Sequence, residues 1–252
     1  KSNEIKEIFR SQKFLSSNPL EQQKSLEKIE DFFDLLIGYY RKPPSSNENF
    51  IESIKSFIIE INDFEKKLAQ LIEVGITPKY IHLANSAATL TNPSSHKNIV
   101  RLGIAMYGLS PDVKILGSSQ DLELQPAMTL KAEIQLVKRV PAGSPVGYGG
   151  TQKTSSDTKL AIITMGYADG IPRNTSSAAG VFAAGRKAPI IGRVSMDQFV
   201  VDLGAESNAV SGEIVEVFGA LGYSIDDWAA ASGTINYEIV TRIAARVPRI
   251  YA

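Results

Sequence analysis

Apolar residues recur every three to four positions in two runs near the start of the chain, a spacing that predicts amphipathic helices. The first run comprises Leu26, Ile29, Phe33, Leu36 and Tyr40, and the second Ile51, Ile54, Ile58, Ile61, Phe64, Leu68 and Leu71. Asn18 and Pro19 form a helix start before the first run, and Gly75 ends the second. Both apolar stripes are predicted to pack as core.

From Tyr80 the pattern changes to short strands. The segments "YIHLANSA" and "NIVRLGIAMYGL" are each apolar, and the first ends in small polar residues. A helix before a strand whose carboxyl end carries small residues is typical of an α/β barrel. We therefore assign residues 1–117 to a helical region and an incomplete α/β (TIM-type) barrel portion.

Beyond Gly117 the pattern is that of a β domain, which we assign to residues 118–252. "MTLKAEIQLVKRV" alternates between apolar and polar residues, and "KLAIITMGYADG", "KAPIIGRVSM", "DQFVVDLG" and "GEIVEVFG" are short β-rich runs. One helix interrupts them, with Ser224 as its cap and Gly233 at its end. The predicted fold class is α/β plus all-β, with a β-barrel-like second domain.

Composition excludes several classes of protein. Lysine and arginine number 27, as do aspartate and glutamate, so no basic surface for nucleic acid is indicated. Cysteine is absent, which excludes disulfides and thiolate sites, and no apolar run is long enough for a membrane helix. The charged start is unlike a signal peptide and lacks a methionine, so we expect a cytoplasmic protein and a piece of a longer chain.

Arg101 is the first candidate for chemistry, because it lies in the otherwise apolar "NIVRLGIAMYGL" and a buried guanidinium needs a partner. His82, buried by its pattern, also needs a hydrogen-bond partner. Ser86, with the backbone of Gly103 and Ile104, could cradle a phosphate between two strand ends. The histidine spacing supports no metal site, and no G-x-S-x-G motif is present.

Three tyrosines lie in unusual contexts: Tyr148 in "GYGGT", Tyr167 in "GYADG" and Tyr237 in "INYE". Glycine beside an aromatic residue weakens a strand and makes poor core, which favours exposure at a loop or pocket. A phenol placed there can exchange protons if its surroundings lower a pKa that is ordinarily about 10.

Six motifs in order resemble the C-terminal part of bacterial alanine racemases, from about Leu68 to Tyr251. They are "IHLANSAATL", "NIVRLGIAMYGL", "VGYGGTQ", "GYADGIPR", "APIIGRVSMDQ" and "INYEIVTRIAARVPRIY". The resemblance implies an N-terminal (β/α)8 barrel that holds pyridoxal 5′-phosphate (PLP), then a C-terminal β domain. It also implies a head-to-tail homodimer that interconverts L- and D-alanine and supplies D-alanine for peptidoglycan, with no nucleic-acid or membrane partner.

The resemblance also implies roles for individual residues. Arg101 would face the pyridine nitrogen of PLP, with His82 bonded to it from behind. The phosphate would be held by Ser86, Gly103, Ile104 and Tyr237. Tyr148 would be one of two catalytic bases and would act in the other subunit's site, where Met196 and Asp197 would contact the substrate carboxylate region. Tyr167, Arg173 and Arg193 would line the substrate access corridor.

The chain departs from the family at the Schiff-base lysine, because no lysine from Lys1 to Lys97 lies in a segment like "KANAYG". Segments like "DTGMxRxG" and "HFAxAD" are also missing, and residues 1–50 match no part of the family. Two hypotheses follow: a racemase whose lysine lies outside this chain, or a non-catalytic homologue that keeps the β domain and the dimer interface.

Two further alternatives concern the reaction. A PLP-dependent decarboxylase of the same architecture generally pairs the pyridine nitrogen with a carboxylate and uses cysteine, so Arg101 and the absence of cysteine argue against it. Serine in place of alanine as the substrate stays open.

Overall fold

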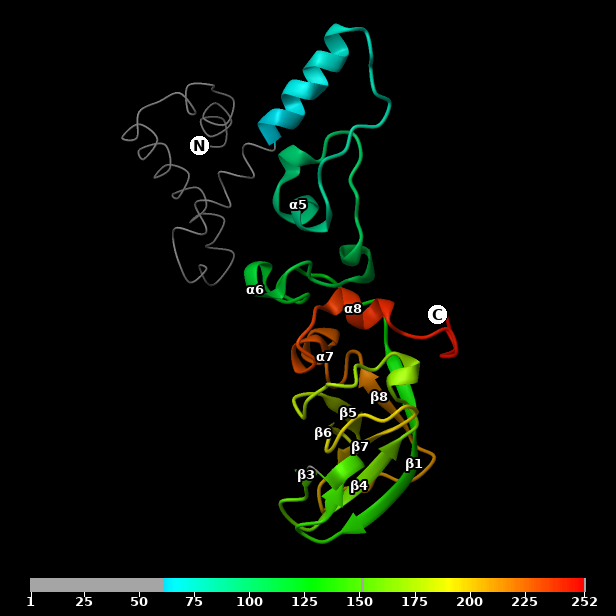
Figure 1. Cartoon of the computed structure of the whole chain (residues 1–252). Coiled ribbons are helices and arrows are strands. Elements are labelled where there is room, and N and C mark those ends of the chain that lie inside the picture. The colour runs from blue at the N-terminus through cyan, green and yellow to red at the C-terminus, as the bar shows by residue number, and fades with distance from the viewer. Residues whose placement is uncertain (1–60, 151, 252) are drawn as a thin grey trace, which may run out of the picture. The chain divides into compact units, whose positions relative to one another are not determined.

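The computed structural model describes residues 61–150 and 152–251 (Figure 1). The chain divides into two compact units, Lys1–Met106 with Ser110–Leu124, and Tyr107–Leu109 with Gln125–Ala252. The predicted helix after Pro19 and the start of the second apolar run lie outside the described residues, and the predicted domain boundary at residue 117 stays a prediction.

The first described helix, over 61–73, ends where the sequence predicts. Gly75 adopts a φ of 82°, its N–H donates to the Ile72 carbonyl at 3.0 Å, and the Ile76 N–H donates to Leu71 at 2.9 Å. This pair of bonds is the Schellman motif, in which glycine takes the left-handed position that ends a helix.

The apolar stripe of this helix is not a core. Ile61, Phe64 and Leu68 are only half-buried, and Leu71 is 40% exposed. The core prediction is therefore wrong for these described residues. The physical reason is that the described part of this unit forms no sheet or second helical layer against which the stripe could pack.

The two predicted strands of the first unit shrink to one parallel bridge between His82 and Ile99. Helix α5 (Ser86–Thr91) follows at once, because the Asn85 side chain accepts from the Ala88 N–H at 3.0 Å and caps it. The 3-10 turns η1 (Pro93–Ser95) and η2 (Ile104–Tyr107) and helix α6 (Val113–Leu116) complete the unit's short elements. A strand that runs directly into a helix, with parallel pairing, is the local geometry of an α/β fold.

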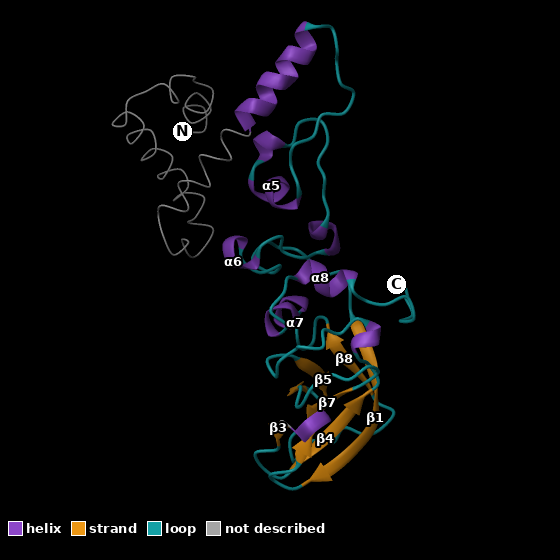
Figure 2. Ribbon diagram, viewed as in Figure 1, coloured by secondary structure: helices purple, strands orange, loops and turns teal. Residues whose placement is uncertain are grey.

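The second unit is built on a six-stranded sheet in the order β6-β5-β8-β1-β4-β7 (Figure 2). The strands are β1 (Leu130–Val140), β4 (Thr158–Ile163), β5 (Gly180–Ala183), β6 (Arg186–Pro189), β7 (Phe199–Asp202) and β8 (Ile214–Phe218). Their pairings are antiparallel, and β2 (Pro145–Val146) pairs separately with β3 (Gln152–Lys153). An antiparallel bridge from Ile190 to Val201 brings the two edge strands together, so the sheet nearly closes on itself.

Buried side chains of the sheet and of helix α7 (Ile225–Ala231) contribute to the core of this unit. The first half of β1 alternates as predicted, with Leu130, Ala132 and Ile134 buried. Trp228 of α7 is fully buried, and its indole N–H donates to the Val217 carbonyl at 2.7 Å. The predicted Ser224 cap is confirmed as a capping box with Asp227.

Helix α8 (Asn236–Thr241) is an element that the sequence analysis missed. Its N-cap residue, Ile235, supplies no side-chain cap, and its sequence carries three β-branched residues, so local propensity gives little signal. Tertiary contacts stabilise it instead: α8 packs on α7, and Asn236 donates to the Asp226 carboxylate at 2.8 Å. Tyr237 therefore sits on a helix rather than in a loop.

The Asp226–Asn236 contact predicts a pH effect on stability. Burial raises the pKa of the Asp226 carboxyl; the Asn236 hydrogen bond opposes this rise, and the Asp227 charge adds to it. Because its pKa is higher in the folded than in the unfolded state, the protonated Asp226 carboxyl stabilises the fold. This contribution is complete at low pH and is lost as the pH rises through the folded-state pKa. We expect Asp226→Asn to raise the thermal midpoint at pH 7 by about 1–3 °C, and to leave it unchanged at pH 3.

Calorimetry at the two pH values checks the Asp226 prediction. Asp227→Asn is the matched control, because Asp227 accepts from the Ser224 N–H at 2.9 Å and its loss should lower the midpoint at pH 7. An equal rise for Asp226→Asn at both pH values would contradict the prediction.

Candidate functional site

Three of the residues predicted to hold a phosphate come together in the first unit. Ser86, the first residue of α5, is 5% exposed, and its Oγ accepts from the Gly103 N–H at 2.8 Å and from the Ala105 N–H at 3.4 Å. With its lone pairs engaged, the hydroxyl proton is left to donate. The Ser86 side chain thus joins the start of α5 to the turn that follows Arg101.

Gly103 lies directly beside this hydroxyl. A Cβ built on Gly103 would lie 3.8 Å from Ser86 Oγ, in ordinary van der Waals contact with it. Ile104 opens η2 and Ser86 opens α5; the Asn85 side chain caps the Ala88 N–H of α5, and the N–H groups that precede it lie ahead of the carbonyls of their own turn. The hydroxyl and these amides form a small cradle of donors suited to a phosphate group.

Arg101 and His82 are arranged differently from the prediction. Both side chains are exposed, so their predicted burial is wrong. The guanidinium donates to the Leu83 carbonyl at 3.5 Å, and within the described residues no hydrogen bond joins it to His82. The cause is the single-bridge pairing at this strand pair, over which the described residues lay no covering layer. Their roles toward a cofactor stay predictions.

In the second unit the loop of Tyr148 rests on the backbone of segment 192–193. Gly147 has a φ of 72°, and a Cβ there would lie 3.2 Å from the Arg193 nitrogen; a Cβ on Gly192 would lie 3.2 Å from the Val146 carbonyl oxygen. The Gln152 side chain also accepts from the Gly192 N–H at 2.5 Å. The two glycines therefore allow these backbones to cross closely.

The loop of Tyr167 rests on the next part of the same segment. A Cβ on Gly166 would lie 2.3 Å from the Met196 carbonyl oxygen, a clash that excludes any other residue. The N–H groups of Tyr167 and Ala168 donate to Ser195 and Met196 at 3.0 and 2.9 Å. Segment 192–197 and the loops 146–148 and 166–168 together form what we call the three-loop junction.

Three side chains of the three-loop junction reach solvent. Tyr148 is 74% exposed, Met196 55% and Tyr167 38%, which confirms the predicted exposure of the two tyrosines. A phenol and a thioether presented this way can contact a ligand or another protein surface.

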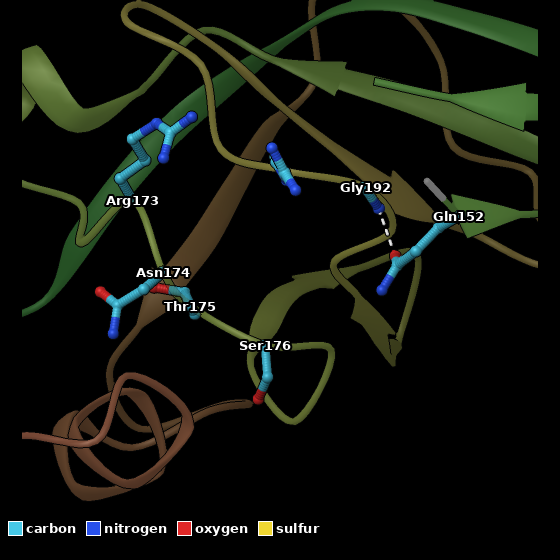
Figure 3. A pocket seen from close by; sticks show the side chains of 7 residues that line it. Gln152, Arg173, Asn174, Thr175, Ser176 and Gly192 are labelled. Carbon is cyan, nitrogen blue, oxygen red and sulfur yellow. Dashed lines mark hydrogen bonds between the residues drawn. The ribbon is translucent and has the colours of Figure 1, made fainter. Parts of the chain in front are cut away.

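Arg173 and Arg193 line one cavity of about 460 Å³ beside the junction (Figure 3). Its remaining lining residues are Gln152, Asn174, Thr175, Ser176 and Gly192. The lining contains two guanidinium groups and no carboxylate, so the cavity favours anions. The structure therefore brings two of the three predicted corridor residues together, whereas Tyr167 is not part of the cavity wall.

Two predicted site residues have surroundings that the sequence did not indicate. Asp197 does not stand free, because Arg246 donates to its carboxylate at 2.7 Å. Arg246 also binds Asp169, and sequence reasoning singled out neither residue, since no local pattern links positions so far apart. Tyr237 is half-buried on α8 in the second unit, and its predicted share in the phosphate site stays a prediction.

Among the described residues, no helix combines the length and the apolar character needed to cross a membrane.

The fold and these clusters define a two-domain class of protein, with an α/β portion that carries a donor cradle and a barrel-like β domain that presents tyrosines. The profile "Alanine racemase, N-terminal domain" matches residues 52–111, and "Alanine racemase, C-terminal domain" matches residues 127–251. The chain belongs to the alanine racemase family, as its C-terminal portion. The predicted fold class is thereby confirmed.

Known relatives agree in extent as well as in sequence. Alanine racemase of Streptomyces coelicolor is 46% identical over 199 residues, which cover 78% of this chain and 50% of that protein. The crystal structure of alanine racemase from D-cycloserine producing Streptomyces lavendulae superposes with a TM-score of 0.75 at 45% identity, over 83% of this chain and 53% of that one. The enzyme from Bacillus anthracis with bound L-Ala-P gives a TM-score of 0.68 at 39% identity, over 78% and 50%. The chain spans about half the length of the curated relatives it matches.

Proposed function

We propose that this chain supplies the C-terminal half of a PLP-dependent alanine racemase, which interconverts L- and D-alanine by moving a proton between two bases. The observation that carries the proposal is the three-loop junction, which packs the loop of Tyr148 against the segment that carries Met196 and leaves both side chains exposed, in a member of this family. The L-Ala-P bound to the Bacillus anthracis relative supports alanine as the substrate.

The residues of the donor cradle fit the phosphate of PLP. Ser86 would donate its hydroxyl proton to the phosphate, and the backbone at Gly103 and Ile104 would lie against the phosphate. Tyr237 would be a further phosphate ligand. Arg101, always charged and exposed here, would face the pyridine nitrogen. Bound PLP supplies an electron sink that makes the α-proton of an amino acid removable.

Tyr148 would take or return that proton on one face of the substrate, and the missing lysine would serve the other face. Met196 would lie against the substrate carboxylate region, with Asp197 beside it. Arg173 and Arg193, which face one cavity, would attract the anionic end of an incoming amino acid.

Exposure of Tyr148 and Met196 in the single chain supports a head-to-tail homodimer, in which each residue acts in the partner's site. Both side chains are open to solvent in the single chain, so a second subunit packed against them would exclude water and complete the site. We place this enzyme in the cytoplasm, where the D-alanine that it forms would be used for peptidoglycan.

The test joins this chain to the N-terminal half of the Streptomyces coelicolor relative, the half of that protein that the chain does not match. We expect this joined protein, supplied with PLP, to convert L-alanine into D-alanine, and the chain alone to be inactive. A joined protein that folds and binds PLP but racemises nothing would refute the proposal.

A second candidate is a non-catalytic homologue, favoured only by the absence of the family's lysine context from Lys1 to Lys97. The joined protein separates the two candidates, since a chain that had lost catalysis would stay inactive beside a competent N-terminal half. Racemisation of L-serine, measured in the same assay, decides whether alanine or serine is the preferred substrate.

Charge reversal at Arg101 tests its proposed place at the ring nitrogen. A carboxylate there favours the protonated ring, which is a stronger electron sink, so the proton can return to atoms other than Cα. We expect Arg101→Glu in the joined protein to raise pyruvate formation, in which the amino group of alanine would pass to PLP, by roughly tenfold per racemisation, read by a lactate dehydrogenase assay for pyruvate. Arg139→Glu on β1, which reverses an exposed charge of the second unit, is the control, and an unaltered product ratio for Arg101→Glu would contradict the assignment.

A further inference from the structure

One arginine joins two carboxylates at the three-loop junction, one directly after the loop 166–168 and the other at the end of segment 192–197. Arg246 Nε donates to Asp169 Oδ1 at 2.7 Å, and its terminal nitrogen donates to Asp197 Oδ1 at 2.7 Å. Asp169 follows Tyr167 by two residues, and Asp197 follows Met196 directly. The planar fork of arginine suits this bridge, because it presents several donors in fixed directions.

Asp169 is the buried end of this bridge. Its side chain is only 12% exposed, and its second oxygen accepts from the Gly166 N–H at 2.8 Å. The backbone adds to the connection, because the Ala244 N–H donates to the Asp169 carbonyl at 2.9 Å. A carboxylate that is mostly buried needs a cationic partner, and Arg246 is the cation that pairs with Asp169.

Asp197 is the exposed end, and its charge matters for the ligand. Its side chain is 63% exposed, and the adjacent Met196 is 55% exposed. An unpaired carboxylate next to the proposed substrate carboxylate region would repel that group, by like-charge repulsion. Pairing with Arg246 both neutralises this charge and fixes the backbone that carries Met196.

We propose that Arg246 is a positioning residue, which holds the Tyr167 loop and the Met196–Asp197 segment in one register and screens Asp197 from the substrate carboxylate. The part of this statement that concerns substrate rests on the proposed function. The part that concerns the loops does not, and the two are tested separately.

Amide hydrogen exchange, followed by NMR on the chain itself, tests the loops. We expect Arg246→Ala to speed exchange of the Tyr167 and Ala168 amides at least tenfold, because both donate to Ser195 and Met196 across the junction. The buried Leu203 amide, which donates to Lys159 at 2.9 Å, should keep its rate. Arg242→Ala is the matched control, since among the residues that the structure describes its side chain pairs only with Glu238, four residues earlier on the surface of α8.

Two results would overturn the loop part of the proposal. One is unchanged exchange at Tyr167 and Ala168. The other is an equal acceleration at Leu203, which would mean that the variant loosens the whole unit rather than the junction.

Steady-state kinetics of the joined protein test the screening of Asp197. We expect Arg246→Gln to raise KM for alanine by about tenfold while kcat changes less than threefold, because the unpaired Asp197 would weaken binding of the substrate carboxylate. Adding Asp197→Asn should then recover most of the KM, since it removes the unpaired charge. A fall in kcat at constant KM, or no recovery, would overturn this part, whereas failure of the proposed function would show as an inactive joined protein with Arg246 intact.

Discussion

Replacing Tyr148 with phenylalanine in the joined protein is expected to reduce racemisation by about 10²- to 10⁴-fold, the usual contribution of a positioned acid–base group. The substitution removes one oxygen atom from a side chain that is 74% exposed, so the fold should be unaffected. Because L- and D-alanine are equally stable, kcat/KM for racemisation must fall by the same factor in both directions.

The two directions separate in a different measurement, namely exchange of the α-proton with D2O. The face served by the remaining base should still exchange, whereas the face served by Tyr148 should not. We therefore expect Tyr148→Phe to wash deuterium into one enantiomer of alanine without inversion, detected by mass spectrometry after chiral separation.

The control is Tyr80→Phe, an exposed tyrosine to which we assign no role. PLP binding, followed by absorbance, should be the same in both variants and in the parent protein. Unchanged racemisation, or loss of exchange from both enantiomers, would refute the assignment of Tyr148 as one of two bases.

The tyrosines illustrate which site features a sequence can reveal. Glycines around Tyr148 and Tyr167 indicate exposure, and the structure agrees because those glycines allow backbones to approach where a Cβ would clash. The bridge at Arg246 could not be found this way, since its partners lie 77 and 49 residues away. Ion pairs across such separations depend on the closed fold and leave no periodic signal.

Secondary-structure elements, like site residues, can be predicted where their contacts are local in sequence. The Ser224 capping box and the Schellman end at Gly75 are local and were predictable, because their partners lie within five residues. Helix α8 was not, since contacts with α7 stabilise it. The expected burial of His82 failed for a related reason: apolar neighbours in sequence do not bury a side chain unless another layer covers it.

Trp228→Ala is expected to destabilise the second unit by about 3–5 kcal/mol, the usual cost of truncating a fully buried large aromatic residue. The indole is 0% exposed and meets Phe199 edge-to-face, with ring centroids 6.0 Å apart. It anchors α7 to the sheet, because its N–H bonds Val217 in β8. Since α7 in turn supports α8, the amides near Tyr237 should also exchange faster.

Urea unfolding followed by circular dichroism measures the loss, because Trp228 is the single tryptophan and fluorescence would vanish with it. Trp228→Phe separates packing from hydrogen bonding. It keeps a ring against Phe199 but leaves the Val217 carbonyl without its donor, so it should cost only about 1–3 kcal/mol.

Tyr251→Ala serves as the matched control for Trp228→Ala, since it truncates an aromatic side chain that is 93% exposed and should change stability by less than about 0.5 kcal/mol. A Trp228→Ala protein as stable as this control would contradict the view that the α7–sheet contact holds the β domain. Faster exchange near Tyr237 without a loss of stability would instead mean that the indole supports α8 alone.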